Sequence, residues 1–178
     1  MSARFAVPAA ILLALLVPAT PAPAQSVLGE DAVACNGGNG AAIRVYVAGL
    51  KDRSGRLKLE LYPANEDDFL KDDTKLKNEG KFFRRIWATT PASGAVTMCI
   101  KAPRPGRYAL LFTHDRDGKN KFNFWRDGVG FPSNRKLGRS RPKWEEATIN
   151  LGGGVTRVAI RAQYLRGFSG FAPYDPND

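Results

Sequence analysis

Residues 41–63 read AAIRVYVAGLKDRSGRLKLELYP. Apolar side chains occupy every second position of residues 43–47 and again of residues 57–61, with polar side chains such as Lys58 between them. A period of two residues is typical of a strand that buries one face. The connection contains Gly55, which favours a turn. This stretch therefore predicts two half-buried antiparallel strands that form a hairpin.

Short strand patterns recur through the rest of the chain. They lie at residues 82–87, 96–100, 108–112, 147–151 and 158–160. Pro and Gly residues at 103–106 and 152–154 predict turns between several of them. No long stretch of helical periodicity follows the N-terminal region. We expect an all-β fold, namely a single antiparallel β-sandwich of about seven strands with one long loop.

The N-terminus has the pattern of a secretory signal peptide. Arg4 is followed by an apolar run at residues 6–17 and by Ala22-Pro23-Ala24, which matches an A-x-A cleavage site. The run is too short to cross a bilayer as a helix, and the prolines after it disfavour the alternative of a membrane anchor. We expect a Sec-type signal peptide cleaved after Ala24, a periplasmic or secreted protein, and no transmembrane segment in the mature chain.

The length of 178 residues suits one folded domain and is too short for two full ones. The expected organisation is a signal peptide at 1–24, an N-terminal segment at 25–40, a β-sandwich domain at 41–165 and a C-terminal tail at 166–178. The tail repeats Gly and Phe before it ends, and we expect it to dock loosely on the domain.

Export determines how the two cysteines, Cys35 and Cys99, are interpreted. Thiols outside the cytosol meet oxidants, so a disulfide between Cys35 and Cys99 is the leading interpretation. The alternatives are lipidation of Cys35 and a catalytic cysteine. The distance of Cys35 from the apolar run disfavours the first, and the presence of only one His disfavours the second. One His and two Cys also exclude a zinc site of three or four N/S ligands and an iron–sulfur cluster.

Positive charge is concentrated in one segment of the chain. The formal net charge is +10, and residues 116–143 hold nine Lys and Arg against two Asp. Aromatic residues interleave with these charges, which is typical of surfaces that bind anions through stacking and ionic contacts. The candidate binding residues of this basic-aromatic loop, 114–144, are His114, Lys121, Trp125, Arg126, Arg135, Lys136, Arg139, Arg141 and Trp144.

These features favour a non-enzymatic binding or envelope-associated module that acts through the basic-aromatic loop. The expected partner is an anionic envelope component or an acidic polysaccharide, because export separates the protein from most nucleic acid. The alternative is that the loop folds back and uses its aromatic residues as a small satellite core.

Residues 114–120, HDRDGKN, suggest two further hypotheses. Asp115, Asp117 and Asn120 resemble the start of an EF-hand calcium loop, although Asn120 stands where that loop needs Gly and no Glu occupies the twelfth position. Calcium is therefore the one cofactor considered, in a calcium-stabilised structural protein, and a hydrogen-bonded turn is the alternative. The second hypothesis is a hydrolase centred on His114 with Asp115 or Asp117, but the chain has no G-x-S-x-G motif.

Four motifs in a fixed order carry a resemblance to a known family. They are PRPGRYA at 103–109, FTHDRDG at 112–118, GVGFPSN at 128–134 and WEEA at 144–147, and the stretch at 41–63 fits the same pattern. Over about residues 41–163 the chain resembles the bacterial domain-of-unknown-function family 2141. The resemblance implies an exported protein with a small β-sandwich, similar to transthyretin-like, immunoglobulin-like or carboxypeptidase-regulatory-like domains. It implies no activity and no catalytic residues.

Overall fold

The structure is a computed structural model, and it describes residues 26–175. The signal peptide predicted at residues 1–24 lies outside the described residues. The strands are β1 (Val27–Leu28), β2 (Ala42–Ala48), β3 (Arg56–Pro63), β4 (Arg84–Thr89), β5 (Val96–Lys101), β6 (Gly106–Asp115), β7 (Gly128–Gly130), β8 (Thr148–Leu151), β9 (Val155–Arg161), β10 (Gln163–Leu165) and β11 (Phe171–Pro173). The helices are α1 (Ala32–Cys35), α2 (Asp73–Asn78), α3 (Trp144–Ala147) and the 3-10 helix η1 (Gly167–Ser169).

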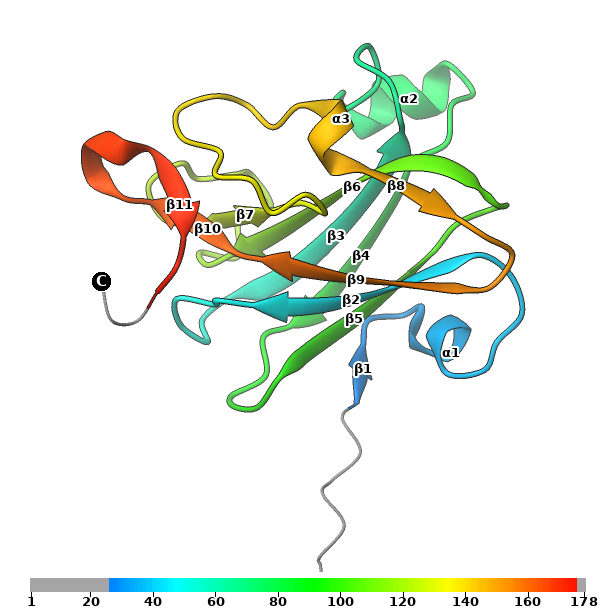
Figure 1. Cartoon of the computed structure of the whole chain (residues 1–178), viewed down its shortest axis with the longest axis horizontal. Helices are drawn as coiled ribbons and strands as arrows, with labels where there is room; N and C mark the ends of the chain where they lie inside the picture. Colours follow the sequence, from blue (N-terminus) through cyan, green and yellow to red (C-terminus); the bar gives the residue numbers. More distant parts are fainter. Residues whose placement is uncertain (1–25, 176–178) are drawn as a thin grey trace, which may run out of the picture.

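Two sheets make up the fold (Figure 1). A four-stranded sheet has the order β1-β5-β2-β9, and a seven-stranded sheet has the order β11-β10-β7-β6-β3-β4, with β8 also paired to β6. The expectation of a mostly-β fold is confirmed. The expectation of a purely antiparallel arrangement of about seven strands is wrong. The pairs β1–β5 and β2–β9 are parallel, and the described residues contain eleven strands.

Both strands predicted at residues 41–63 form, as β2 and β3, but the predicted hairpin does not. β2 lies between β5 and β9 in the four-stranded sheet, whereas β3 lies between β6 and β4 in the seven-stranded sheet. The seven residues 49–55 connect them, and Gly49 and Gly55 adopt left-handed backbone conformations with φ of 71° and 66°. This connection passes from one sheet to the other. Alternating burial determines which face of a strand is apolar, but it does not determine the partner strand.

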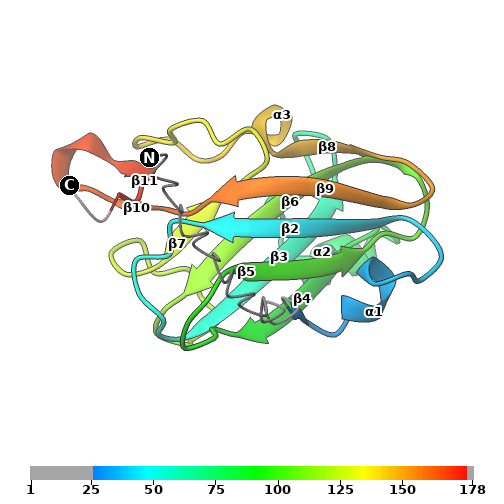
Figure 2. The ribbon, with the colours of Figure 1, turned by 60° about the horizontal axis from the view of Figure 1, so that its bottom comes forward.

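The two sheets share one hydrophobic core, and Figure 2 shows β9, β2 and β5 in front of β6 and β3. Val45 and Met98 of the four-stranded sheet and Phe112 of the seven-stranded sheet are fully buried in this core. The two sheets approach closely at β7, where a Cβ on Gly130 would lie 2.5 Å from Ile160 Cγ2. The glycine therefore allows β7 to pass directly beneath the end of β9.

The opposite face of the seven-stranded sheet, here called the outer face, is covered as well. A second cluster of buried residues joins Leu111 of β6 and Val129 of β7 to Leu76 of α2 and Phe171 of β11. This covering layer explains why β3 is buried along both faces from its second to its seventh residue. The half-buried strand predicted from residues 57–61 is therefore buried on its polar face too.

Both terminal segments of the described chain belong to the folded unit. β1 and α1 pack on β5, and Asp31 accepts a hydrogen bond from Arg84 Nε at 2.6 Å. At the other end, β11 pairs with β10 and Phe171 is buried, whereas Phe168 is 93% exposed. The folded unit thus extends beyond the predicted boundaries of 41–165. The C-terminal tail was expected to dock loosely, but part of it forms strand β11, which pairs with β10.

The predicted disulfide is present in the structure. Cys35 of α1 and Cys99 of β5 are joined, with their Cα atoms 6.0 Å apart. The bridge fastens the N-terminal segment to the four-stranded sheet. Within residues 26–175, no helix has the length and apolar character needed to cross a bilayer.

Candidate functional site

A pocket of about 430 Å³ lies on the outer face of the seven-stranded sheet. Strands β3, β4, β6 and β7 form its floor. Its walls come from the loop 116–127, the loop 131–143, the segment that leads into α2, and β11. We call it the outer pocket. Concave sites with apolar walls and a few convergent polar groups are typical of ligand-binding pockets.

Three charged side chains lie in the floor of the outer pocket. Lys58 and Glu60 come from β3, and Arg85 of β4 is paired with Glu60 in register. Glu60 Oε1 accepts a hydrogen bond from Arg85 Nε at 2.8 Å, and Glu60 Oε2 lies 3.2 Å from Lys58 Nζ. Glu60 is 3% exposed and Lys58 is 7% exposed. Charged groups rarely occupy such positions without partners. Lys58 and Arg85 share the buried carboxylate of Glu60, and Arg85 Nη1 also lies 3.7 Å from Asp73 Oδ2 at the edge of the pocket. The cations of the floor are therefore held in place, and the surplus of positive charge comes from the rest of the lining.

Aromatic side chains form much of the wall. Phe122 and Phe124, both from the loop after β6, contact Phe171 of β11 with ring centroids 6.0 and 5.0 Å apart. Each of the two loop phenylalanines is 44% exposed, so part of each ring remains available for contact. Tyr62 of β3 also lines the pocket, and burial, assisted by the charge of Glu60, raises the pKa of its phenol above the usual range. The Tyr62 hydroxyl is therefore neutral at physiological pH.

Two of the predicted binding residues, Arg139 and Arg141, stand at the rim of the outer pocket and are exposed. Arg139 Nε donates a hydrogen bond to the carbonyl oxygen of Phe168 at 3.0 Å, which ties the loop to the C-terminal segment. The complete lining contains five Lys and Arg against three Asp and Glu. This combination of positive charge and aromatic surface suits an anion with an apolar body.

The remaining loop residues predicted to bind a ligand lie outside the outer pocket. Lys121, Trp125, Arg126, Arg135 and Lys136 are exposed on the loop surface. Trp144 lines an adjoining depression of about 670 Å³ beside α3, which shares Arg141 and part of the segment before α2 with the outer pocket. The structure thus brings Arg139 and Arg141 to the outer pocket, and the sequence pattern did not distinguish them from loop residues that face solvent.

The charged floor was not among the predicted site residues. In the sequence, Lys58 and Glu60 are the polar half of an alternating strand, which is the pattern of a solvated face. The alternative of a loop that folds back with its aromatic residues as a satellite core was the one expectation that pointed to a further layer on the sheet. The sequence contained no signal that placed this loop over β3.

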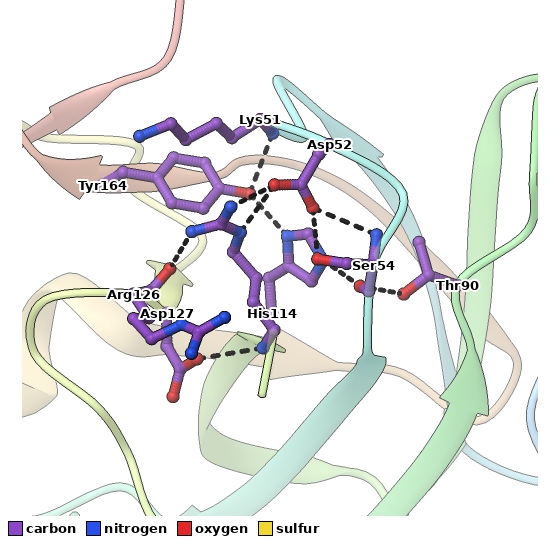
Figure 3. A network of polar contacts seen from close by, with 9 residues as sticks. Lys51, Asp52, Ser54, Thr90, His114, Arg126, Asp127 and Tyr164 are labelled. Atoms are coloured by element: carbon purple, nitrogen blue, oxygen red, sulfur yellow. Dashed lines mark hydrogen bonds and ion pairs between the residues drawn. The ribbon is translucent and has the colours of Figure 1, made fainter. Parts of the chain in front are cut away.

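His114 lies near the end of β6 and is fully buried, and Figure 3 shows its ring between Tyr164 of β10 and Ser54 of the connection from β2 to β3. Its Nδ1 is 2.7 Å from the Tyr164 hydroxyl, and its Nε2 is 2.8 Å from the Ser54 carbonyl oxygen. Because a carbonyl only accepts, Nε2 carries the proton and Nδ1 accepts from Tyr164. The backbone N–H of Lys51 donates to the same hydroxyl at 3.1 Å. Both ring nitrogens are thus bound to Tyr164 and Ser54 and not to Asp115 or Asp117. The hydrolase hypothesis needs an exposed histidine as a base, and His114 is buried.

Beside this histidine, Arg116 joins several segments. Its Nε donates to Asp52 Oδ2 at 2.8 Å and its Nη1 donates to the carbonyl oxygen of Arg126 at 2.7 Å. Its backbone N–H donates to Asp127 Oδ1 at 2.9 Å. Burial alone would raise the pKa of Asp52, but hydrogen bonds from Arg116 and Ser54 lower it well below its usual value. The ion pair therefore persists at neutral pH and anchors both ends of the loop.

Three aspartates converge where β6 ends and β7 begins, and we call them the acid cluster. Asp115, Asp117 and Asp127 each place one carboxylate oxygen within 4.8 Å of the other two. The first two were predicted calcium ligands. The third predicted ligand, Asn120, instead donates its backbone N–H to Asp115 Oδ2 at 3.1 Å. Asp127 was missed because it meets the others only through the antiparallel pairing of β6 and β7, which spacing along the chain does not reveal.

Comparison with known proteins gives one match. No curated protein and no solved structure matches the sequence. A family model described as an uncharacterized protein conserved in bacteria, DUF2141, matches residues 45–159, which run from β2 to β9. The matched region contains the strands of the pocket floor, both covering loops and the acid cluster. Because the match spans more than half of the chain, the protein belongs to the DUF2141 family, as its ordered motifs indicated.

Proposed function

We propose that the protein is an exported, non-enzymatic binding module of the periplasm or cell surface, and that it holds an anionic, partly apolar envelope component in the outer pocket. The observation that supports this most directly is the composition of the pocket. An open pocket of about 430 Å³ has aromatic walls over a floor that holds the buried Lys58 and the half-buried Arg85, and the lining has a surplus of positive charge. Neither a neutral apolar ligand nor a bare polyanion would use both features.

The two kinds of group would act on different parts of the ligand. The acidic head would lie near Lys58 and Arg85, with Arg141 at the rim, and the apolar body would pack against Phe122 and Phe124. The ion pairs of the floor already hold their cations in place, so little side-chain entropy is lost on binding. An arginine at the rim increases the rate of encounter with an anion more than it increases the final affinity.

The proposal is tested by isothermal titration with three probes: laurate, heparin and dodecyl maltoside. Laurate combines an anionic head with an apolar chain, heparin provides charge without the chain, and dodecyl maltoside provides the chain without charge. We expect laurate to bind with a stoichiometry of one and with an affinity that falls as the NaCl concentration rises. The other two probes should bind more weakly.

Variants identify where the probe binds. Phe124→Ala removes a half-exposed aromatic contact and Arg141→Ala removes an exposed charge, so each should weaken laurate binding by about five- to tenfold. The matched controls are Tyr46→Ala and Arg157→Ala, because both residues are exposed on the four-stranded sheet. The controls should leave the affinity unchanged.

Two results would count against the outer pocket. If the controls weaken laurate binding as much as the pocket variants do, the probe binds non-specifically. If heparin alone binds and Phe124→Ala has no effect, the exposed arginines of the loop form a polyanion surface for an acidic polysaccharide, and the pocket is not the site.

A further inference from the structure

The acid cluster is separate from the outer pocket. None of its three residues lines that pocket. Asp115 and Asp127 are buried and Asp117 is half-buried, so two of the three carboxylates have little access to water. Water normally stabilises grouped carboxylates, and its exclusion makes the grouping unfavourable unless another partner is present.

One carboxylate oxygen in the cluster lacks such a partner. Asp115 Oδ2 accepts hydrogen bonds from Arg56 Nη2 at 3.0 Å and from the backbone N–H of Asn120 at 3.1 Å. Asp115 Oδ1 is buried and accepts no hydrogen bond, although the side chain is only 3% exposed. Because Oδ2 is occupied, Oδ1 is the oxygen that Asp115 has free for a ligand. A buried, unsatisfied carboxylate oxygen is strongly unfavourable, and a bound cation would satisfy it.

The charge of the cluster indicates the kind of cation. Arg56 is the cation paired with the cluster, and it is held in place by Gly118 O at 2.7 Å and by the Trp87 ring at 4.3 Å. Three carboxylates and one guanidinium leave two negative charges. The nearby Lys119 and Arg126 are exposed, where water screens their charge. A divalent cation would balance what remains.

The other two carboxylates are held in place by the loop itself. Asp127 accepts the backbone N–H groups of Arg116 at 2.9 Å and Asn123 at 2.7 Å, and Asp117 accepts the Asn123 side chain at 3.1 Å. These hydrogen bonds hold the three carboxylates close together against the repulsion of their like charges.

We propose that Asp115, Asp117 and Asp127 bind a calcium ion that ties the loop 116–126 to the ends of β6 and β7. The ligand set contains only oxygen atoms, which suits a hard cation and disfavours zinc or copper. Calcium tolerates an irregular set of ligands that water completes, whereas magnesium requires near-ideal octahedral geometry. The site does not depend on ligand binding in the outer pocket. It would, however, stiffen the loop that carries Phe122 and Phe124.

The experiment uses the purified protein after treatment with EGTA and desalting. Isothermal titration with CaCl₂ should give one ion per chain, with an affinity in the range of roughly 0.1–1 mM found for extracellular calcium modules. Addition of 10 mM CaCl₂ should raise the melting temperature by roughly 3–10 °C, and EGTA should reverse the shift. Equimolar MgCl₂ should produce a much smaller shift.

The decisive variant is Asp117→Asn, because this half-buried residue is replaced without loss of volume. It should abolish the calcium-dependent shift, and Asp127→Asn should do the same. Asp67→Asn, which changes an exposed carboxylate elsewhere, should retain the full shift. The proposal is overturned if the unmodified protein shows no calcium-dependent shift, if Asp117→Asn retains it, or if magnesium reproduces it. Laurate binding without any calcium response would reject this site and leave the outer pocket intact.

Discussion

His114 should make the stability of the protein depend on pH below about 6.5. It is the only histidine in the chain, it is fully buried, and its pKa is lowered from 6.5, chiefly by burial. The hydrogen bond with the Ser54 carbonyl acts in the opposite direction but does not prevail. A second proton would go to Nδ1, which already accepts from the Tyr164 hydroxyl. Protonation therefore requires that hydrogen bond to rearrange in a fully buried site.

The sign and the size of the effect follow from proton linkage. Since the folded pKa of His114 lies below the unfolded value of 6.5, the unfolded chain binds the proton first as the pH falls. The free energy of unfolding should decrease by at most about 1.4 kcal/mol per pH unit below pH 6.5, or about 2 kcal/mol by pH 5. Asp127 works in the opposite direction, because its folded pKa is raised and protonation in the folded state adds stability. A variant is therefore needed to isolate the histidine.

The assay is urea unfolding followed by circular dichroism from pH 5.0 to 7.5, with calcium held constant, for the unmodified protein and for His114→Gln. Glutamine is uncharged throughout this range. We expect the unmodified protein to lose stability toward pH 5 and the variant, although less stable at pH 7.5, to show a smaller dependence on pH. Equal slopes for the two proteins would refute the argument, and so would a stability of the unmodified protein that does not change below pH 6.5.

Two further predictions concern the packing of the sheets. Replacing both cysteines in Cys35→Ala/Cys99→Ala opens a loop with a sequence separation of 64 residues, and should destabilise the fold by about 4 kcal/mol, lowering the melting temperature by roughly 8–16 °C. If calorimetry shows an unchanged melting temperature for the double variant, the disulfide does not stabilise the fold as predicted. Gly130→Ala places a Cβ 2.5 Å from Ile160 Cγ2 and should reduce the free energy of urea unfolding by about 1–3 kcal/mol, whereas Gly152→Ala, which faces open space, should change it little. Equal effects of the two substitutions would contradict the packing argument.

The sequence predicted the strands well and their partners poorly. Alternating apolar residues at 43–47 and 57–61 correctly identified β2 and β3, because burial of one face imposes a period of two. The same pattern says nothing about the neighbour. At five connections, β2 to β3, β4 to β5, β5 to β6, β8 to β9 and β9 to β10, the chain leaves one sheet and enters the other. The first four contain glycine or proline, so they read as turns within one sheet.

The disulfide was predictable because two cysteines allow only one pairing within the chain. Only Cys35 and Cys99 are present, and the predicted export favours their oxidation. The acid cluster was half predictable, since Asp115 and Asp117 lie within one turn of chain. Asp127 joins them across two paired strands, so its place follows from strand register and not from local sequence.

The outer pocket was the least predictable feature, and the reason is physical. Lys58 and Glu60 alternate with leucines, and a strand of that kind normally exposes its polar side to water. Here the loops cover that side, and the buried Lys58 and the half-buried Arg85 share the buried carboxylate of Glu60. Covering a charged face is unfavourable for folding alone, since a solvated face would avoid the desolvation of three ions. The retention of these ions beneath exposed aromatic rings is the arrangement expected of a site that binds a charged ligand, and it is the reason to test the outer pocket with an amphipathic anion.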